Sequence, residues 1–468
     1  MEAKTLPFKA KERKFFGTDG IRGVAGEPPL EPEWLVRLGK SLAAVFVKDK
    51  SRRHSILIGK DTRLSGYMIE TALASGITYM GANVLLVGPI PTAGAAYLTK
   101  SMRADAGIMI SASHNPFQDN GVKIFGADGF KLPDELELQI EKLCLEGDFK
   151  ALKKEKVVSG KNIGKAKRID DGIGRYTVYL KEAFPRNLTL EGLKIGLDCA
   201  HGAAYVVAPQ TFEELGASVT ARGVNPNGTN INAGFGSLYP KIMCELVSEQ
   251  NLNLGVSFDG DSDRAILVDE KGKVVDGDMI LAIAAKYLKE KGELKGGGVV
   301  GTAMSNLGLE VYLESLGLKL YRAAVGDRYV LEKMLQLGCN LGGEQSGHII
   351  FLDYSTTGDG ILTALKVCEI MLTTEKTLSE LTKGFHHFPQ KVINVAVRKK
   401  PALEEIAPVQ KAISSVENKL GKKKGRVLVR YSGTEDKARV MVECEEQKLC
   451  DEYAQEIAEA IEKEIGKV

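Results

Sequence analysis

The segment Ile56–Val87, with the sequence ILIGKDTRLSGYMIETALASGITYMGANVLLV, contains the pattern that decides the fold. A short apolar run, Ile56–Gly59, leads through a polar loop to a helical pattern near Met68–Tyr79. A turn with glycine then opens a second apolar run, Met80–Val87. Strands that alternate with helical patterns are typical of a β-α-β unit with a parallel sheet, and glycine commonly ends the helix. The segment therefore predicts an α/β domain.

The same order of patterns recurs twice more, and this repeat sets the domain organisation. The second copy spans Leu193–Val219 and the third spans Val299–Tyr321. The end of the chain differs, because Val392–Arg398 alternates like a strand, Leu403–Leu420 reads as a helix, and two strand patterns and an amphipathic helix follow. The sequence thus predicts three similar mixed α/β domains and a smaller C-terminal α+β domain. We expect these domains at 1–160, 165–272, 273–385 and 390–468.

Composition and charge exclude several classes of protein. At roughly 150 residues per domain, the 468 residues suggest three or four domains. Lysine and arginine total 63 against 61 acidic residues, so the net charge of +2 gives no support to a nucleic-acid partner. No apolar stretch reaches the ~18 residues that span a bilayer, and Met1–Lys14 lacks the apolar core of a signal peptide. We therefore expect neither a nucleic-acid partner nor a membrane partner.

The seven cysteines are scattered singly and show no Cys-x-x-Cys or Cys-His spacing. A chain of this length can form its core without disulfides, so we expect all seven to be reduced thiols. Reduced thiols and the lack of a secretion signal together predict a cytoplasmic protein.

The segment DGDSDR places three carboxylates, Asp259, Asp261 and Asp263, within five residues. Such charges repel one another unless a cation lies among them. Alternate residues of an extended loop point the same way, so the three can bind Mg²⁺, which prefers carboxylate, phosphate and water oxygens. The alternatives are a solvated acidic loop and a calcium EF-hand with Glu270 at its last position. However, Arg264 stands where an EF-hand needs glycine, and the flanking segments read as strands.

An apolar strand pattern runs directly into Ser111–Pro116, SASHNP. A serine beside a histidine suggests a nucleophile, but the Gly-x-Ser-x-Gly pattern of acyl-transfer enzymes is lacking. A serine that transfers phosphate would instead need cations and a metal, which Lys123 and the acidic loop can provide. The alternative is a helix cap and turn without a chemical role.

Three further glycine-containing loops carry polar side chains that suit an anionic polyol. In Gly17–Gly23, glycines on both sides of Arg22 permit close backbone approach. Gly342–His348 gathers a Glu, a Gln, a Ser and a His. Arg430–Glu435 lies between two strands with Arg439 beyond it, so amides, hydroxyls and guanidiniums can converge on a phosphate. Each loop alone is equally well explained as an ordinary turn, but together they predict one shared cleft.

These motifs, in this order and spacing, resemble those of the α-D-phosphohexomutase superfamily over essentially the whole chain. The resemblance implies three similar α/β domains and a smaller C-terminal domain around a central cleft, which agrees with the internal repeat. Gln345 and the segment Gly326–Val330 are similar to members that act on glucosamine phosphates. Members that act on mannose and glucose phosphates tend to have Met at the position of Gln345.

The resemblance also implies a role for each motif. Ser113 is implied to be carried as phosphoserine. The implied ligands of Mg²⁺ are Ser113, Asp259, Asp261 and Asp263. The residues implied to act near the transferred phosphate and proton are Arg22, His114, Lys123, Arg264 and His348, with Lys123 and His348 as candidates for the general base and acid. The residues implied to bind the substrate are Glu344, Ser346, Arg430, Ser432, Gly433, Thr434 and Arg439.

The implied reaction interconverts glucosamine 6-phosphate and glucosamine 1-phosphate, a step towards UDP-N-acetylglucosamine and peptidoglycan precursors. Phosphoserine donates its phosphoryl group to the free O1 or O6 of the sugar, and the other phosphate of the resulting bisphosphate returns to the enzyme. A sugar 1,6-bisphosphate is therefore expected as an activator. The alternatives are a phosphomannomutase/phosphoglucomutase and a catalytically inactive sugar-phosphate sensor. We expect a monomer or a homodimer.

The C-terminal loop departs from the superfamily pattern at Tyr431, where Pro or Lys is usual, and at Asp436, where Pro is usual. Asp436 puts a negative charge beside the proposed phosphate site, and at ~8 Å in water the repulsion is roughly 1 kcal/mol before screening. This predicts that Asp436→Asn lowers KM by up to ~5-fold with kcat nearly unchanged. The alternative is that Asp436 points to solvent and the substitution has no effect.

Overall fold

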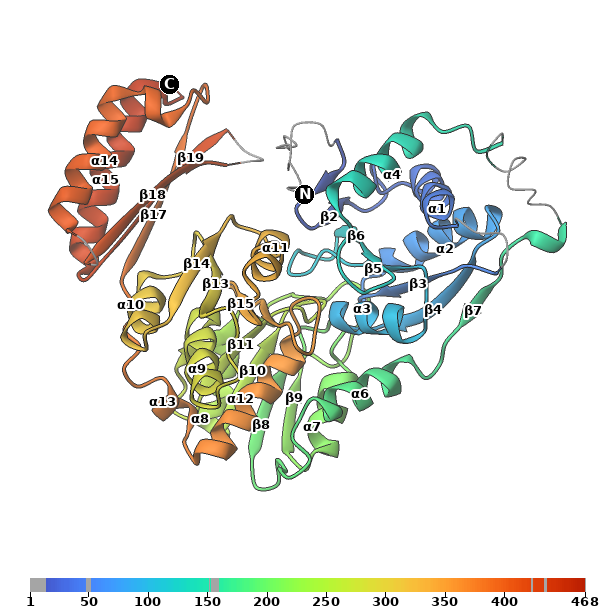
Figure 1. The fold of residues 1–468 in the computed structure, drawn as a ribbon, viewed down its shortest axis with the longest axis horizontal. Coiled ribbons are helices and arrows are strands. Elements are labelled where there is room, and N and C mark those ends of the chain that lie inside the picture. Colours follow the sequence, from blue (N-terminus) through green and yellow to red (C-terminus); the bar gives the residue numbers. More distant parts are fainter. Residues whose placement is uncertain are drawn as a thin grey trace. The chain divides into compact units, whose positions relative to one another are not determined.

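The computed structural model describes residues 14–47, 52–150, 152, 160–421, 424–432 and 436–467. These residues form two compact units, one within Met1–Ala303 and Tyr321–Lys383 and the other within Met304–Leu320 and Gly384–Val468. Four separate sheets carry the fold (Figure 1). No helix in the described ranges is both long and apolar enough to cross a membrane.

The first sheet is mixed and has the order β1-β2-β6-β5-β3-β4-β7. Its strands β5, β3, β4 and β7 run parallel, whereas β6 pairs antiparallel with both β5 and β2. The predicted first β-α-β unit is confirmed as β3-α2-β4. The strands are β1 (Phe16–Gly17), β2 (Gly20–Val24), β3 (Ser55–Lys60), β4 (Asn83–Pro89), β5 (Ala106–Ile110), β6 (Asp119–Gly126) and β7 (Ala166–Arg168). The helices are α1 (Pro32–Phe46), α2 (Ser65–Tyr79), α3 (Thr92–Ser101) and α4 (Asp134–Glu146).

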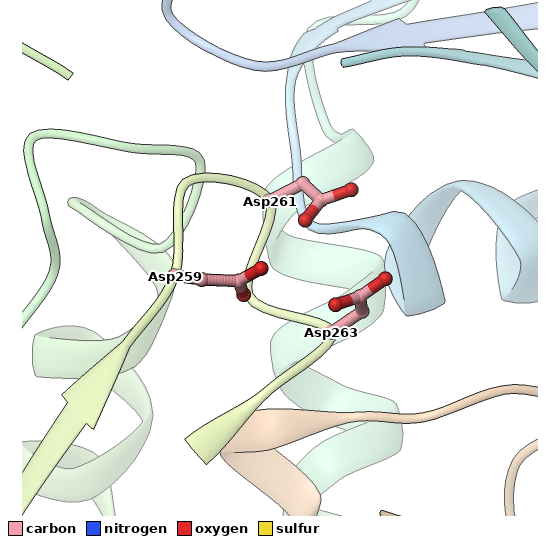
Figure 2. A group of neighbouring side chains, drawn as sticks. All are labelled: Asp259, Asp261 and Asp263. Atoms are coloured by element: carbon pink, nitrogen blue, oxygen red, sulfur yellow. The ribbon is translucent and has the colours of Figure 1, made fainter. Parts of the chain in front are cut away.

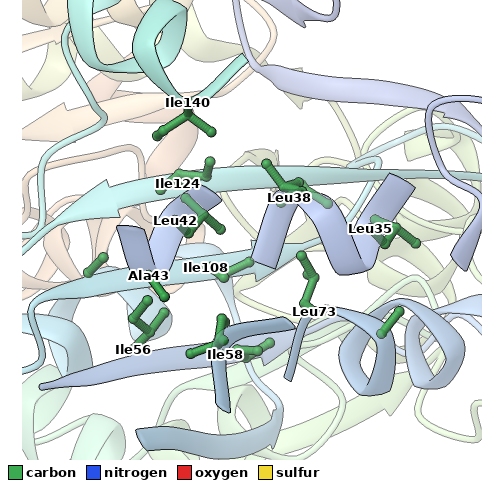
Figure 3. Packing of buried hydrophobic residues seen from close by; sticks show 14 of the residues in the cluster. Leu35, Leu38, Leu42, Ala43, Ile56, Ile58, Leu73, Ile108, Ile124 and Ile140 are labelled. Atoms are coloured by element: carbon green, nitrogen blue, oxygen red, sulfur yellow. The ribbon is translucent and has the colours of Figure 1, made fainter. Parts of the chain in front are cut away.

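The core of this domain lies between α1, α2, α4 and one face of the sheet (Figure 3). Leu35, Leu38 and Leu42 recur at helical spacing along one face of α1 and are fully buried. They share a cluster with Ile56 and Ile58, which alternate along β3 and are also fully buried. Removal of this apolar surface from water holds the helices on the sheet and so fixes the ends of the strands that carry the site.

The second sheet has the order β12-β11-β10-β8-β9. Strands β10, β8 and β9 are parallel, and β10 forms an antiparallel hairpin with β11. The predicted second unit is confirmed as β8-α7-β9. The strands are β8 (Lys194–Asp198), β9 (Ser218–Arg222), β10 (Leu254–Phe258), β11 (Ala265–Asp269) and β12 (Val274–Val275). The helices are η2 (Gly160–Asn162), α6 (Gly172–Glu182), α7 (Val207–Glu214) and α8 (Pro240–Gln250).

The third sheet has the order β14-β13-β15-β16, and β15 and β16 form an antiparallel hairpin. Asp276 and Asp359 cap two of its helices, because their carboxylates accept hydrogen bonds from backbone amides of the first turn. The strands are β13 (Gly298–Thr302), β14 (Lys319–Ala323), β15 (Leu341–Gly343) and β16 (Ile349–Phe351). The helices are α9 (Gly277–Glu290), α11 (Asp327–Leu337), α12 (Gly360–Thr374) and α13 (Leu378–Leu381).

The second unit contains the predicted small α+β domain, with an antiparallel sheet of order β17-β19-β18. The predicted helix Leu403–Leu420 is divided, because Pro408 lacks an amide hydrogen and so favours the start of a new helix just before it. The strands are β17 (Gln390–Ala396), β18 (Gly425–Tyr431) and β19 (Lys437–Cys444). The helices are α10 (Leu307–Ser315), η3 (Leu403–Glu405), α14 (Ala407–Leu420) and α15 (Gln447–Ile465).

Two cysteines of this unit correct a prediction from the sequence. Cys444 ends β19 and Cys450 lies in the first turns of α15, and the two form a disulfide with their Cα atoms 5.8 Å apart. The tight turn between strand and helix brings residues six positions apart within bonding reach. The prediction that all seven cysteines are reduced is therefore wrong for this pair. The free cysteines are Cys144, Cys199, Cys244, Cys339 and Cys368.

Candidate functional site

The acidic segment DGDSDR forms the turn between β10 and β11. Ser262 in this turn has a left-handed backbone (φ 56°), as a sharp reversal requires. Asp259, Asp261 and Asp263 are buried, and one carboxylate oxygen from each lies within 4.8 Å of the other two (Figure 2). The turn therefore concentrates three carboxylates in a site shielded from water, as expected for a cation site.

Two side chains from the first domain contact this acidic turn. Lys123 Nζ, on β6, donates to Asp261 Oδ2 at 2.8 Å and to Asp263 Oδ2 at 3.0 Å. Thr92 Oγ1, at the start of α3, donates to Asp261 Oδ2 at 2.7 Å. The acidic turn is thus held against the first sheet by charge-assisted hydrogen bonds.

Two carboxyl groups of this turn have pKa values that are shifted in opposite directions. Burial raises the pKa of Asp263, but Lys123 and His348 outweigh burial and hold that pKa well below its usual range. Burial and the neighbouring Asp263 and Asp261 raise the pKa of Asp259 well above its usual range. Lys123 and the nearby Arg264 therefore do not hold the pKa values of all three carboxyl groups low, a pattern that suits a site for a further cation.

The acidic turn fits a divalent metal ion. Asp261 Oδ1 and Asp263 Oδ1 are buried and accept no hydrogen bond, which is costly unless something else satisfies them. A hard cation such as Mg²⁺ binds carboxylate oxygens and would satisfy both. The EF-hand alternative fails, because strands flank the turn and Glu270, its last ligand, accepts a hydrogen bond from the amide of Ser379 at 3.2 Å.

Ser113 lies in the loop after β5 and contacts the acidic turn directly. Its Oγ donates to Asp259 Oδ2 at 2.5 Å and lies 3.2 Å from His114 Nδ1. Ser113 is 1% exposed and has a left-handed backbone (φ 52°). The loop leads into β6 at Asp119, so the segment is a turn and the alternative of a helix cap is wrong.

Two arginines place positive charge beside this serine. Arg22 and Arg264 line a cavity of about 390 Å³. Burial, Arg264 and Arg22 lower the pKa of His114 to about 4, so His114 is neutral at pH 7. Arg22 and Arg264 therefore give the cavity wall permanent positive charge, to which His114 adds none. The same wall also carries acidic side chains, namely Asp19, Asp263, Asp327 and Glu344.

His348, in the turn between β15 and β16, also lines the cavity. The amide of Gly358 donates to His348 Nε2 at 3.1 Å, and His348 Nδ1 lies 3.7 Å from Asp263 Oδ1. Burial lowers the pKa of His348, but Asp263 outweighs burial and raises it. A ring that accepts at Nε2 carries its proton on Nδ1, where it faces the carboxylate of Asp263.

Lys123 is the second candidate for proton transfer. Burial lowers its pKa, but Asp19, Asp261 and Asp263 outweigh burial and raise the pKa well above its usual range. Lys123 is therefore protonated at neutral pH. In this arrangement it suits a proton donor or a charge partner of phosphate better than it suits a base.

The predicted sugar-binding side chains also border the cavity or its rim. Glu344 follows β15 and accepts from the amide of Gly326 at 3.2 Å and from Ser346 Oγ at 3.1 Å. Glu344 is one of the residues that line the cavity. The turn therefore presents a carboxylate and a hydroxyl in contact with each other, a pair that suits hydroxyl or amino groups of a sugar.

The C-terminal loop belongs to the second unit, and the predicted residues Gly433 and Thr434 lie outside the described residues. Arg430 on β18 stands directly opposite Arg439 on β19. Burial and the adjacent Arg439 lower the pKa of Arg430. Ser432 follows at the end of β18, and its amide donates to the carbonyl of Lys437 at 2.8 Å. Two neighbouring guanidiniums that repel each other favour a bound anion.

Asp436 is 67% exposed, and its carboxylate lies 3.5 Å from Lys400 Nζ and 3.5 Å from Lys467 Nζ. These lysines offset its charge, so we expect Asp436→Asn to change KM by less than about twofold, a smaller gain than the sequence alone predicts. Steady-state kinetics with glucosamine 6-phosphate at low and high salt check this. A fivefold fall in KM at low salt would show that Asp436 repels bound phosphate in spite of both lysines.

Two charged residues of the cavity wall, Asp19 and Asp327, and Lys131, which pairs with both, were not predicted from the sequence. Asp19 forms ion pairs with Arg22, Lys123 and Lys131, and Lys131 also pairs with Asp327. Asp19 stands within the glycine-containing loop that surrounds Arg22, so that motif was a usable signal. Asp327 stands in the segment Gly326–Val330, which carries part of the family resemblance, so that segment was a usable signal. Lys131 belongs to no motif, and only the folded chain reveals it.

Three more unpredicted residues contact the Ser113 loop, namely Asp61, Arg63 and Asn232. Asp61 and Arg63 directly follow β3, at the carboxyl end of parallel strands, where polar residues of α/β sheets gather. That position was a usable signal. Asn232 lies in an asparagine-rich loop of the second domain, and its spacing gives no indication of a role.

Comparison with protein-family models assigns every domain to one family. Models described as "Phosphoglucomutase/phosphomannomutase, alpha/beta/alpha" domains I, II and III match residues 13–151, 175–272 and 276–388. The model of the C-terminal domain of the same family matches residues 392–460. The matches follow one another in chain order and cover most of the chain.

Curated relatives cover nearly the whole chain. A phosphoglucosamine mutase of Syntrophotalea carbinolica is 53% identical over 455 residues, which is 97% of this chain and 98% of that protein. A phosphoglucosamine mutase of Anaeromyxobacter sp. is 54% identical over 458 residues, which is 97% of this chain and 96% of that protein.

Solved structures share the fold at lower identity. A phosphoglucomutase/phosphomannomutase family protein from Burkholderia thailandensis has a TM-score of 0.77 and 20% identity, with 95% of this chain and 97% of that chain covered. The N-acetylphosphoglucosamine mutase of Aspergillus fumigatus, solved with GlcNAc-6P and magnesium, has a TM-score of 0.65 and 19% identity, with 96% of each chain covered. These likenesses confirm the predicted fold.

Proposed function

This chain belongs to the phosphoglucomutase/phosphomannomutase family, and the curated relatives that are 53% and 54% identical to it are phosphoglucosamine mutases. On that premise, we propose how its residues interconvert glucosamine 6-phosphate and glucosamine 1-phosphate. The chain is a phosphohexomutase, an isomerase that moves a phosphoryl group within its substrate. The observation that carries the residue-level proposal is the 2.5 Å contact between the buried hydroxyl of Ser113 and Asp259 in the acidic turn.

Ser113 is the carrier of the phosphoryl group. The bond between its Oγ and phosphorus breaks while a bond forms to O1 or O6 of the sugar phosphate, and the sugar hydroxyl gives up its proton to a base. Ser113 Oγ takes up a proton as it leaves phosphorus. The resulting sugar 1,6-bisphosphate then reacts at its other phosphate: the bond between phosphorus and that sugar oxygen breaks while a bond forms to Ser113 Oγ, Ser113 gives up its proton, and the sugar oxygen takes one up. Free Ser113 has no phosphoryl group to donate, so a sugar 1,6-bisphosphate is the proposed activator.

Mg²⁺ is the proposed metal, held by Asp259, Asp261, Asp263 and an oxygen of the Ser113 phosphate. The two buried oxygens of the acidic turn that accept no hydrogen bond, Asp261 Oδ1 and Asp263 Oδ1, support this ligand set. When bound, the metal ion supplies positive charge that offsets the negative charge of the transferred phosphoryl group. The carboxylates themselves remain in place through their bonds to Lys123 and Thr92.

Permanent positive charge beside Ser113 is the proposed source of further electrostatic stabilisation. Arg22 and Arg264 line the cavity and bind the equatorial phosphate oxygens. Lys123, held protonated by three carboxylates, is the proposed acid. His348 is the proposed base, because its Nε2 carries no proton when it accepts a hydrogen bond from the amide of Gly358. To act as the base, Nε2 releases this amide and accepts the proton of a sugar hydroxyl instead.

Substrate orientation is assigned to two further groups of residues. Glu344 and Ser346 are proposed to bind the sugar, since both are polar, mutually bonded and next to the catalytic cavity. The phosphate that is not transferred is proposed to bind the C-terminal residues Arg430, Ser432, Gly433, Thr434 and Arg439. The paired arginines of β18 and β19 support this assignment.

In the cell, we place the product on the route to UDP-N-acetylglucosamine and peptidoglycan precursors, with the enzyme cytoplasmic and monomeric or homodimeric. The alternatives are a mutase for mannose and glucose phosphates on the same scaffold and a sensor without turnover. The intact Ser113 and acidic turn count against the sensor, because a sensor has no use for a buried serine bonded to a carboxylate cluster.

A coupled assay with the three hexose 6-phosphates tests the substrate. We expect kcat/KM for glucosamine 6-phosphate to exceed that for mannose or glucose 6-phosphate by at least about tenfold, because the carboxylate of Glu344 can pair with the charged amino group at C2, whereas the other two sugars carry a neutral hydroxyl there. Equal or higher kcat/KM for mannose 6-phosphate would favour the phosphomannomutase alternative. Binding of all three sugars without turnover, in the presence of Mg²⁺ and glucose 1,6-bisphosphate, would favour the sensor.

A further inference from the structure

The loop that carries Ser113 holds an unusual backbone conformation. Ser113 has φ 52°, a left-handed value that a residue with a Cβ adopts only when its surroundings impose it. The carbonyl oxygens of Ser113 and Asn115 are bound by the same two side chains, one from each of two domains. Side chains from two domains therefore hold the loop through the same two carbonyl oxygens.

The first of these side chains is Arg63, which follows β3. Its Nη2 donates to the carbonyl of Ser113 at 3.1 Å and to the carbonyl of Asn115 at 2.6 Å. Its Nη1 pairs with the carboxylate of Asp61. Arg63 and Asp61 are both at most 1% exposed, so their bonds are not weakened by competing water.

Asp61 extends the same network to the backbone amide of Ser113. Ser111 Oγ donates to Asp61 Oδ2 at 2.6 Å and accepts from the amide of Ser113 at 2.9 Å. The reason is topological: Lys60 and Ile110 are partners at the ends of the adjacent parallel strands β3 and β5, so the residues after them meet.

The second side chain is Asn232, from the loop after β9 in the second domain. Its Nδ2 donates to the carbonyls of Ser113 and Asn115, at 2.9 Å each. Asn232 is 8% exposed, and its own amide donates to the carbonyl of Ala200 at 2.9 Å. The donor is thus itself fixed by the second domain.

We infer that Arg63 and Asn232 are positioning residues that hold the Ser113 loop in its left-handed conformation and so aim the Ser113 hydroxyl at the acidic turn. The inference rests on the proposed role of Ser113 as phosphoryl carrier. Neither side chain bonds the hydroxyl itself, so neither is a catalytic residue. Loss of either donor relaxes the peptide and misplaces the hydroxyl, while the cavity that binds the sugar phosphate keeps its residues.

The experiment compares substitutions at Asn232 and Arg63 with a control at Asn230, all in the full-length enzyme. Asn232→Ala removes the donor, and Asn232→Asp keeps the shape but replaces the donor by an acceptor that repels both carbonyls. Asn230→Ala is the matched control, because the side chain of Asn230 bonds Asn225 and Asn227 within the same loop and, in the described part of the chain, makes no hydrogen bond to the Ser113 loop. Each variant is assayed for kcat, KM, thermal unfolding, and the rate at which glucose 1,6-bisphosphate phosphorylates Ser113, followed by intact mass.

We expect both substitutions of Asn232 to lower kcat by about 10²-fold, as displacement of a reacting group by about 1 Å does, with KM within about twofold. The rate of Ser113 phosphorylation should fall by the same factor. Asn230→Ala should remain within about twofold of the wild-type enzyme. Arg63→Lys, which keeps a charge opposite Asp61 but loses the fork of donors, should reproduce the fall in both rates.

The inference is overturned if Asn232→Asp retains the wild-type kcat, since the shape of the side chain, and not its hydrogen-bond donor, would then matter. It is also overturned if kcat falls while Ser113 is phosphorylated at the wild-type rate, or if Asn230→Ala loses as much activity as Asn232→Ala. Ser113→Ala distinguishes these outcomes from failure of the proposed function. If that variant still takes up phosphate from the bisphosphate, the carrier is not Ser113, whatever Asn232 does.

Discussion

Ser113→Ala is expected to abolish mutase turnover while glucosamine 6-phosphate still binds. The variant loses the only atom that carries the phosphoryl group, but it retains the arginines, His348 and Glu344 of the cavity. The loss of kcat should exceed about 10³-fold, since removal of a covalent nucleophile leaves only binding and electrostatics. Turnover is measured by the coupled assay and binding by titration calorimetry.

The binding measurement is the control for the Ser113→Ala variant. An affinity within about threefold of wild type shows that the cavity is intact and that the loss lies in the chemical step. Turnover within about tenfold of wild type would contradict the phosphoserine assignment, because Ser113 could then not be the obligatory carrier.

Removal of the metal site should have the next largest effect. Asp261→Ala deletes one of three converging carboxylates and leaves Thr92 without its acceptor. Metal ions supply several kcal/mol of charge stabilisation in such reactions, and each 1.4 kcal/mol is a factor of ten, so kcat should fall by at least about 10²-fold. Wild-type enzyme in EDTA should lose as much activity and recover it when Mg²⁺ is added.

Direct measurement of metal binding separates this effect from misfolding. Titration calorimetry with Mg²⁺ alone should show binding to the wild-type enzyme and none to Asp261→Ala. Glu270→Ala is the matched control, because Glu270 bonds Ser379 and does not face the acidic turn. Equal wild-type activity in EDTA and in Mg²⁺ would show that the acidic turn is not a catalytic metal site.

The fold is largely predictable from local patterns, because its repeated unit is short and strongly marked. The alternating apolar residues of β3 and the helical spacing of α2 lie next to each other in the sequence. In the third repeat, predicted at Val299–Tyr321, the structure has the expected helix at Leu307–Ser315. By contrast, the predicted helix Leu403–Leu420 divides in the structure. Pro408 was the usable signal, because proline favours the first turn of a helix and so decides where α14 starts.

The reacting groups of the site are predictable because each motif is contiguous. Ser113 and Asp259 each stand in a dense polar segment directly after an apolar strand. Their partners are not predictable in this way. Lys131 meets Asp327 across 196 positions, and Asn232 meets Ser113 across 119 positions, so these pairs exist only after the domains have folded together.

The protonation states of the site also depend on the folded chain. Lys123 reads as a plausible base in the sequence, but three carboxylates that approach it from separate segments hold it protonated. Likewise, His114 is next to Ser113 in the sequence, yet burial and two arginines keep it neutral at pH 7. Such effects depend on distances between segments and are not encoded in any one motif.

The central claim is that Ser113 carries the phosphoryl group during turnover, and a pulse-chase experiment tests it most directly. Wild-type enzyme is labelled with glucose 1,6-bisphosphate that carries radioactive phosphate, freed of excess label, and mixed rapidly with glucosamine 6-phosphate. The account predicts that the label lies on the peptide that contains Ser113 and passes to sugar phosphate at a rate no slower than kcat. Label on another residue, or label on Ser113 that leaves more slowly than kcat, would contradict it.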